Sequence, residues 1–458
     1  MSDLVACVDF GSTFTKALLV DTATAELVAT AEAPTTIGSD LLEGWGTCRD
    51  RLAESAPAAR RAPVLACSSA GGGLRIAVVG NEELVTAEAG RRVALSSGGR
   101  VVHVAVGGLA HDGLPQLAAS APDVVLLVGG TDGGNSEVLL AAAQCLADAP
   151  WPGPVVVAGN AHAAAEVSGL LAAAGVDADA VANVVPQIGV LQPDPARGAI
   201  RAMFLRHVIG GKHLSASTEF AAMVTGPTPD VVLTAVELLA ESEGDVAVVD
   251  VGGATTDVYS VVALDPHDDG LAPQVVAAMP VNRTVEGDLG MRWSAESTVE
   301  SALVAGLVAA SEAPGLTAGA VRRAGDVRLV PADAPDADLD LRLAELAAEM
   351  ALRRHAGRQR VAFGPDGRLV ERSGTDLREV QLLVGSGGVL RHSVASRAEQ
   401  VLRRCTGADV EGGWLLPRAP RLVVDSSYAL VAAGLLRRHH FEAARVLLRD
   451  HVARSGAG

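Results

Sequence analysis

The feature that most constrains this 458-residue chain is a short segment that occurs twice. VACVDFGSTFTKALLV, at residues 5–20, aligns without a gap with VAVVDVGGATTDVYSV, at residues 246–261. Each copy predicts a buried strand ending in an aspartate, a glycine turn with hydroxyl residues, and a second strand. Because the two copies lie about half a chain apart, they indicate two related domains that face each other across a cleft.

The turn of each copy contains residue types that bind phosphate and metal ions. Glycine lets a phosphate approach backbone N–H groups closely, and Lys16 can neutralise its charge as a point cation. Asp9 and Asp250 are hard oxygen ligands suited to Mg²⁺ or its waters, and such a carboxylate can also orient the water that attacks a terminal phosphate. In one loop alone the aspartate could simply cap its own turn. Two copies in register favour phosphate binding.

Three other glycine-containing segments stand out in the sequence. GSGG at residues 385–388 would let a nucleoside lie against the backbone, although in isolation it indicates a plain strand-to-helix turn. VGGTDGGN at residues 128–135 leads into a helix whose N-terminus could meet an anion, and capping of that helix by Asn135 or Ser136 is an equal alternative. RTVEGDLGMRW at residues 283–293 has no clear chemical signature, and a salt-bridged surface turn is the favoured interpretation.

The pattern of strands and helices predicts an α/β fold with two domains. The first, residues 1–240, contains an α/β insertion around residues 64–190, and the second, residues 241–458, contains an insertion around residues 265–375. Further expectations concern local structure: a helix-rich region at 195–228, surface loops at 265–273 and 331–340, a last strand directly before GSGG, and helices at 229–242 and 427–438.

Composition and charge exclude several classes of protein. Hydrophobic residues make up 49% of the chain but aromatic residues only 3%, which suits strands of Ala, Val and Leu buried on both faces. The net charge of −17 argues against nucleic-acid and anionic-membrane partners. The cysteines are widely spaced and form no CxxC pair, and the N-terminus has no basic signal region. We therefore expect a soluble cytoplasmic protein with free thiols.

The order of these motifs also resembles a known superfamily. DFGSTFTK, DVGGATTD and GSGGVL are similar, in this order, to the first phosphate loop, the second phosphate loop and the adenosine loop of the ATPases that include actin, sugar kinases and heat-shock chaperones. The resemblance implies duplicated actin-like (ribonuclease H-like) domains with ATP/ADP and Mg²⁺ in the cleft between them. Helices 229–242 and 427–438 resemble the connecting helices of that fold.

A closer resemblance covers nearly the whole chain. CSSAGGGLRIAVVG, ELVTAEAGRRVAL, LLVGGTDGGN, VVDVGGATTDVYS and EGDLGMR together resemble the glutamate mutase (methylaspartate mutase) accessory proteins, the GlmL or MutL-like family. Members are found beside adenosylcobalamin-dependent mutases. By analogy with the diol and glycerol dehydratase reactivases, the resemblance implies an ATP-driven chaperone that lets damaged cobalamin leave an inactivated mutase and fresh coenzyme enter.

Carried over by position, the resemblance gives catalytic and metal-binding roles to Asp9 and Asp250. It places nucleotide contacts on Gly11, Ser12, Thr13, Thr15, Lys16, Gly252, Gly253, Thr255, Thr256, Gly385, Gly387 and Gly388. The lysine that chaperone members use in the insertion of the first domain has no match here. The resemblance therefore does not establish how fast this protein hydrolyses ATP.

Three alternatives within the same fold remain open from the sequence. A small-molecule kinase would need a catalytic aspartate near a sugar-type pocket in the first domain, and none is identified. A hydantoinase-like hydrolase, suggested by GGTDGG, would need a cluster of histidine and carboxylate ligands, and no such spacing occurs. A filament-forming actin relative is disfavoured by the strongly acidic surface. The client mutase and the oligomeric state are not identified.

Overall fold

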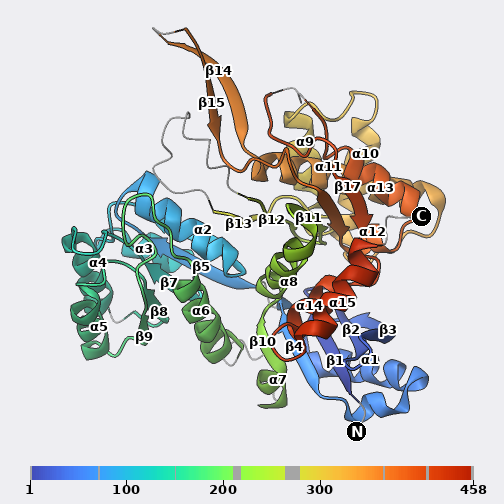
Figure 1. Cartoon of the computed structure of the whole chain (residues 1–458), viewed down its shortest axis with the longest axis horizontal. Helices are drawn as coiled ribbons and strands as arrows, with labels where there is room; N and C mark the ends of the chain where they lie inside the picture. Colours follow the sequence, from blue (N-terminus) through green and yellow to red (C-terminus); the bar gives the residue numbers. More distant parts are fainter. Residues whose placement is uncertain are drawn as a thin grey trace. The chain divides into compact units, whose positions relative to one another are not determined.

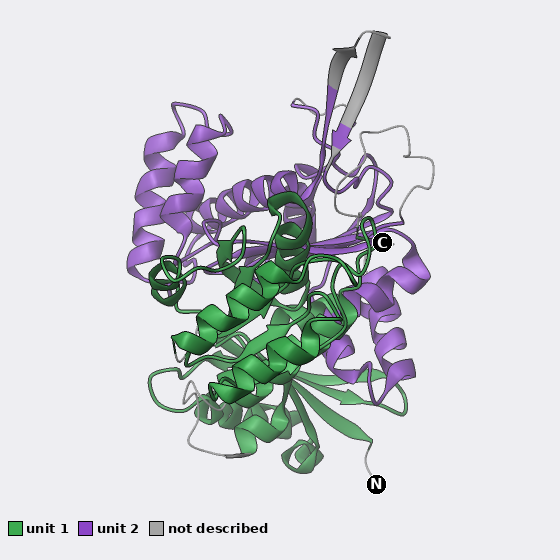
Figure 2. Cartoon of the chain, turned by 90° about the vertical axis from the view of Figure 1, so that its left-hand side faces the viewer, with its two compact units in different colours: residues 1–233, 274–279 green, residues 234–273, 280–458 purple. Residues whose placement is uncertain are grey.

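The computed structural model (Figure 1) describes residues 3–70, 73–149, 151–209, 218–263, 279–364, 367–408 and 412–454. The chain divides into two compact units, shown in different colours in Figure 2. Unit 1 comprises residues 1–233 and 274–279, and unit 2 comprises residues 234–273 and 280–458. The expected loop at 265–273 lies outside the described residues.

The main sheet of unit 1 carries the first copy of the repeat. Its strands, in the described part of the chain, are ordered β10-β4-β1-β2-β3. The first three strands in sequence form an antiparallel meander, and the other two run parallel to β1. The bounds are β1 (Leu4–Phe10), β2 (Phe14–Asp21), β3 (Glu26–Pro34), β4 (Val64–Ser68) and β10 (Val224–Pro227).

The main sheet of unit 2 carries the second copy and has the same plan. Its described strands are ordered β13-β12-β11-β16-β17, again with an antiparallel meander followed by two parallel strands. The bounds are β11 (Val246–Val251), β12 (Thr256–Val261), β13 (Val281–Glu286), β16 (Leu382–Ser386) and β17 (Arg421–Val424). The prediction of an α/β fold with duplicated ribonuclease H-like sheets is therefore confirmed.

A second sheet of unit 1 lies in the sequence between β4 and β10. All of its described strands are parallel, in the order β6-β5-β7-β8-β9. Val124–Leu127 and Val155–Val157 are fully buried, as expected for parallel strands covered by helices on both faces. The bounds are β5 (Leu74–Val79), β6 (Gly99–Ala105), β7 (Val124–Leu127), β8 (Val155–Val157) and β9 (Ala178–Ala180).

Helices cover these sheets with Ala- and Leu-rich faces. In unit 1 they are α1 (Leu41–Ser55), α2 (Glu88–Ser96), α3 (Leu114–Ala119), α4 (Glu137–Asp148), α5 (Ala164–Ala173), α6 (Asp194–Met203) and α7 (Thr218–Met223). Helix α8 (Thr228–Glu243) contains both the division between the units and the predicted domain boundary at 240/241. One short 3-10 helix is η1 (Pro57–Arg61), and short π-helices are η3 (Glu83–Ala87), η4 (Phe204–Ile209) and η6 (Arg449–Ala453).

In unit 2 the longest helix, α11 (Ala334–His355), packs against β11 and β12. The other helices are α9 (Ala295–Val304), α10 (Ala313–Gly325), α12 (Gly388–Arg391), α13 (Ala395–Arg403), α14 (Ala429–Leu436) and α15 (Phe441–Leu448). Strands β14 (Arg358–Gly364) and β15 (Gly367–Ser373) form a separate antiparallel pair. Within the described residues, no helix combines the length and the apolar character needed to cross a membrane.

The region expected to be helix-rich, 195–228, contains α6, η4 and α7, but its residues 224–227 are the strand β10. Two local expectations are wrong, since β17 comes after β16, the strand expected to be the last, and the expected loop at 331–340 is largely helix. Strands β10 and β17 are short and lie at the edges of their sheets, so their pairing depends on the rest of the sheet. The expected loop at 331–340 becomes the start of α11, because Asp333 caps the helix by accepting from the N–H of Asp336 (2.9 Å) and Pro335 occupies its first turn.

Candidate functional site

The two repeat hairpins pair their strands in the same register. Asp9 lies opposite Lys16 in the β1–β2 hairpin of unit 1. Asp250 lies opposite Asp257 in the β11–β12 hairpin of unit 2. Residues that align in the two copies of the sequence repeat thus occupy equivalent positions in the two hairpins. We call residues 11–13 the first loop and residues 252–255 the second loop.

Each loop is closed by a hydrogen bond from its leading glycine. The N–H of Gly11 donates to the carbonyl of Phe14 (3.2 Å), and the N–H of Gly252 donates to the carbonyl of Thr255 (2.9 Å). A Cβ would lie only 2.7 Å from the Phe14 oxygen at residue 11, and 2.8 Å from the Thr255 oxygen at residue 252. Both positions therefore need glycine for space.

The carbonyl side of the first loop is held by Thr35, which directly follows β3. Its hydroxyl donates to the carbonyl of Gly11 (2.8 Å) and its N–H donates to the carbonyl of Thr13 (2.9 Å). Across a trans peptide, a carbonyl and the next N–H point in opposite directions. Holding the Gly11 carbonyl therefore turns the Ser12 N–H away from Thr35. The N–H groups of Ser12 and Thr13 donate no hydrogen bond within the described residues.

The second loop is held in the same way by residues 289–294, which follow β13 and are called here the support segment. Three loop carbonyls accept hydrogen bonds from it: Gly252 from Met291 N–H (3.0 Å), Gly253 from Arg292 N–H (2.8 Å) and Ala254 from Ser294 Oγ (2.7 Å). The N–H groups of Gly253 and Ala254 donate no hydrogen bond within the described part of the chain. A loop with bound carbonyls and open N–H groups is an anion-binding arrangement.

The support segment needs a glycine to approach the second loop this closely. A Cβ at Gly290 would lie 2.7 Å from the Ala254 carbonyl carbon and 2.8 Å from the Gly253 oxygen. RTVEGDLGMRW, which carried no chemical signature in the sequence, thus contains the support of the second loop. Its charged residues are also not a simple surface turn, because Arg292 pairs with Asp340, whose side chain is 6% exposed.

Two predicted phosphate contacts lie on the inner side of their hairpins. Thr15 and Thr256 are completely buried. The hydroxyl of Thr256 donates to the carbonyl of Leu289 (3.0 Å), and that of Thr15 lies 3.3 Å from the hydroxyl of Thr35. Both side chains therefore contact the segments that hold the loops. Their predicted contact with phosphate does not fit this placement.

The Asp9 carboxylate is buried at the end of β1 and accepts a short hydrogen bond. Thr228 Oγ1 donates to Asp9 Oδ1 at 2.6 Å, and Cys67 Sγ lies 3.5 Å from the same oxygen. Burial, together with the Asp9 charge, holds the pKa of the Cys67 thiol well above its usual range. Lys16 Nζ lies 4.0 Å from Asp9 Oδ2. Thr228 was not predicted from the sequence, although a helix was expected to begin at residue 229.

The second hairpin has a carboxylate, Asp257, at the position that Lys16 occupies in the first hairpin, and an ion pair neutralises its charge. Asp257 accepts from Arg283 Nε (3.0 Å) and from Thr255 Oγ1 (3.1 Å). Burial lowers the pKa of the Arg283 guanidinium, but the charge interactions and hydrogen bonds with Asp257 and Tyr259 together outweigh burial and raise it. The ion pair therefore fixes the Thr255 hydroxyl. Asp250, half-buried at the end of β11, is the carboxylate that corresponds to Asp9.

The glycines of the third loop have different roles. A Cβ at Gly385 would lie 2.9 Å from Leu390 Cδ1, so this glycine makes room for packing. Gly387 has a φ of 104°, and a Cβ there would lie 2.2 Å from the Val251 carbonyl oxygen. Gly388, at the start of α12, is exposed and has open space around it. Of the three predicted nucleoside contacts, Gly388 is the accessible one.

The carboxylates at the strand ends fit a magnesium ion that arrives with a nucleotide. No group of three or more His, Cys, Asp or Glu residues among the described residues could hold a metal by itself. Mg²⁺ in phosphate sites, however, needs only one or two carboxylates in addition to phosphate oxygens and waters. Asp9 and Asp250 satisfy that requirement as single carboxylates at corresponding positions of the two hairpins.

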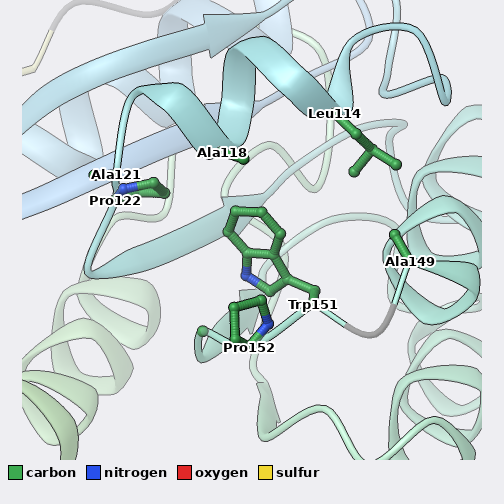
Figure 3. A pocket seen from close by; sticks show the side chains of 8 residues that line it. Leu114, Ala118, Ala121, Pro122, Ala149, Trp151 and Pro152 are labelled. Carbon is green, nitrogen blue, oxygen red and sulfur yellow. The ribbon is translucent and has the colours of Figure 1, made fainter.

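Two other features of unit 1 lie apart from the hairpins. The loop at 128–135 is held by hydrogen bonds within unit 1. Asn183 Nδ2 donates to Asp132 Oδ1 (2.9 Å), and Asn135 accepts from the Glu137 N–H (2.9 Å) at the start of α4. A pocket of about 370 Å³ (Figure 3) has an apolar lining and contains none of the predicted site residues. Its lining comprises Leu114, Ala118, Ala121, Pro122, Ala149, Trp151, Pro152 and Gly153.

Comparison with known proteins identifies the family. The family model described as MutL protein matches residues 5–452. The chain belongs to the MutL family. Protein MutL of Clostridium tetanomorphum is 36% identical over 444 residues, which are 95% of this chain and 96% of the relative. The predicted family resemblance is thus confirmed over almost the full length of this MutL-family chain.

Several solved structures are partly similar to this chain. The nucleotide-free structure of acetone carboxylase has a TM-score of 0.32 at 14% identity, covering 77% of this chain and 62%, less than two thirds, of that chain. The ethanolamine utilization protein EutJ from Carboxydothermus hydrogenoformans has a TM-score of 0.26 at 11% identity, covering 93% and 86%. Xylulose kinase from Bifidobacterium adolescentis has a TM-score of 0.30 at 12% identity, covering 98% and 94%. Similarity at this level says nothing about activity.

Proposed function

We propose that this MutL-family protein binds Mg-ATP through its two hairpin loops and acts as an ATP-dependent reactivating factor. Its client would be an adenosylcobalamin-dependent mutase of the glutamate mutase type, from which it promotes the exchange of damaged cobalamin for fresh coenzyme. The observation that carries the ATP-binding part is the pair of equivalent loops, each with bound carbonyls and open N–H groups. Family membership and the motif order support the mutase client.

In this proposal the backbone binds the phosphates. In the first loop the donors are the N–H groups of Ser12 and Thr13, with Gly11 giving the phosphate room and Lys16 supplying positive charge. In the second loop Gly252 gives the room, and the N–H groups of Gly253, Ala254 and Thr255 are the donors. Ala254 was not predicted as a phosphate contact, because it is not a glycine and carries no hydroxyl group. Thr15 and Thr256 keep a supporting role, and Gly388 is the adenosine contact.

The carboxylates supply the chemistry of hydrolysis. Asp9, held by Thr228, orients the waters of Mg²⁺, which when bound neutralises phosphate charge. Asp250 either holds Mg²⁺ or orients the water that attacks the terminal phosphate. Lys16, at 4.0 Å from Asp9 Oδ2, would turn from this carboxylate toward a phosphate oxygen. ATP and ADP would favour different conformations of the protein, which the client mutase senses.

The test is reactivation of a damaged mutase. An adenosylcobalamin-dependent mutase from the same genome is inactivated with hydroxocobalamin and mixed with this protein, fresh coenzyme and Mg-ATP, and mutase turnover is followed. We expect recovery with Mg-ATP and none without it. Asp250→Asn should abolish recovery, whereas Glu442→Gln, the same charge change at a carboxylate that is 77% exposed, should not.

Either alternative class would give a different result. If the mutase does not recover while ATP is consumed in the presence of small alcohols or lactams, the protein is a small-molecule kinase or a hydantoinase-like hydrolase. Recovery that is independent of ATP, or that persists in Asp250→Asn, would contradict the role of the second loop.

A further inference from the structure

One residue of the support segment joins the second loop to the helices of unit 2 through both its backbone and its side chain. The Arg292 N–H donates to the carbonyl of Gly253 (2.8 Å). Its guanidinium donates to both carboxylate oxygens of Asp340 (2.9 and 3.2 Å) and to the carbonyl of Leu329 (2.9 and 3.2 Å). A planar guanidinium bound at two edges has a fixed orientation.

The anchor of Arg292 is itself buried and fixed. Asp340, on α11, also accepts from Arg323 Nε of α10 (2.5 Å), and the Arg323 side chain is completely buried. The other Arg323 nitrogens donate to the carbonyls of Gly319 (3.2 Å) and Asp336 (2.9 Å). Asp340 therefore binds two arginines that come from different segments of unit 2.

A buried ion network of this kind is weak evidence for a role in stability. Well-packed apolar side chains of similar volume often give equal or greater stability. What the network supplies is a defined position for Arg292, and through its N–H a defined orientation of the Gly253–Ala254 peptide. Because the carbonyl of Gly253 is held on one side, the N–H of Ala254 points to the other. The orientation of this donor matters when a phosphate binds, since productive contacts tolerate only small displacements.

From these contacts we infer that Arg292, held by Asp340, is a positioning residue for phosphate binding by the second loop. It sets the direction of the Ala254 N–H without contacting the nucleotide. The inference rests on the proposed function, because it specifies how that same loop binds phosphate. It also assigns a role to EGDLGMR, a family motif that has no predicted chemistry.

The test compares ligands with and without phosphates. Affinities of the full-length protein for Mg-ATP and for adenosine are measured by competition against a fluorescent methylanthraniloyl-ATP. Arg292→Met removes the ion pair but keeps the backbone N–H. We expect it to weaken Mg-ATP binding about tenfold, the order of one hydrogen bond to a charged group, and to leave adenosine binding unchanged. Arg292→Lys, which keeps the charge, should restore part of the loss.

Arg322→Met is the matched control, because Arg322 also pairs with an aspartate, Asp336, but its side chain is 56% exposed. It should change neither affinity. Equal Mg-ATP affinity in Arg292→Met and the wild type, or equal losses for Mg-ATP and adenosine, would overturn the positioning role. If Arg292→Met does not fold, the affinities of Arg292→Lys for Mg-ATP and adenosine are compared with those of the wild type instead, and the same outcomes decide. A wild-type protein that binds no Mg-ATP would overturn the proposed function itself.

Discussion

Replacing Gly290 by alanine tests the contact between the support segment and the second loop. The added Cβ would lie 2.7 to 2.9 Å from three backbone atoms of Gly253 and Ala254, whereas ordinary contact begins at 3.4 Å, so the two segments must separate by roughly half an ångström. The three hydrogen bonds that join them, now 2.7 to 3.0 Å long, would approach the limit of a useful hydrogen bond. Overpacking of a well-packed site costs about 1–3 kcal/mol.

We therefore expect Gly290→Ala to lower the free energy of unfolding by about 2 kcal/mol. The corresponding fall in Tm is roughly 4–8 °C for a unit of this size, measured by differential scanning calorimetry. Mg-ATP affinity should fall as well, because the N–H donors of the loop lose their alignment. Gly315→Ala is the control, since its Cβ would enter open space. At the third residue of α10 it should raise stability by no more than about 0.5–1 kcal/mol. An unchanged Tm and an unchanged Mg-ATP affinity in Gly290→Ala would refute the reasoning.

Three further predictions concern buried groups. Burial lowers the pKa of His355 to about 3. Below about pH 6.5, the usual pKa of histidine, the unfolded chain therefore binds a proton at this residue that the folded chain does not bind. The free energy of unfolding should fall by about 2 kcal/mol from pH 7.5 to 5. His355→Gln should lose this dependence, and equal slopes would contradict the assignment. Thr228→Val removes the donor to buried Asp9 and should cost about 1–3 kcal/mol in denaturant unfolding, more than Thr225→Val, whose hydroxyl bonds only a carbonyl. All 5 cysteines are buried. Ellman's reagent should react with none in the native protein and with all after denaturation, and a fast native reaction would contradict their burial.

The hairpins could be predicted from sequence because their contacts are local. Each strand pairs with the strand that directly follows it, and the aspartate and glycine mark the turn between them. The repeat then showed that two such hairpins share one plan. The order of the strands in the two main sheets agrees with that plan, and short-range patterns were sufficient for the fold class.

The partners of the hairpins could not be predicted in the same way. Thr228 lies 219 residues from Asp9 in the chain, and Arg292 is paired with Asp340 at a separation of 48 residues. Nothing local to these residues specifies the partner. The predicted phosphate contacts of Thr15 and Thr256 do not fit their buried placement, for a related reason. A hydroxyl next to a glycine turn predicts a ligand contact, but strand alternation turns both side chains to the buried face.

Some of the missed features did have a readable signal. Asp333 and Pro335 are typical of a helix start, and they mark the beginning of α11. Thr35 and Gly290 each follow the third strand of the meander in their sheet, and each supports the loop of its own half. No strand was predicted directly before Gly290, so this correspondence became visible only in the structure.

The measurement that tests the central claim most directly is the stoichiometry and loop dependence of Mg-ATP binding. Calorimetric titration of the full-length protein should give one nucleotide per chain. Gly11→Ala and Gly252→Ala, which place a Cβ 2.7 and 2.8 Å from the carbonyl that closes each loop, should each weaken binding. Gly315→Ala should not. One site weakened by both loop variants is the predicted result. Absence of binding, or binding that either loop variant leaves unchanged, would contradict the account.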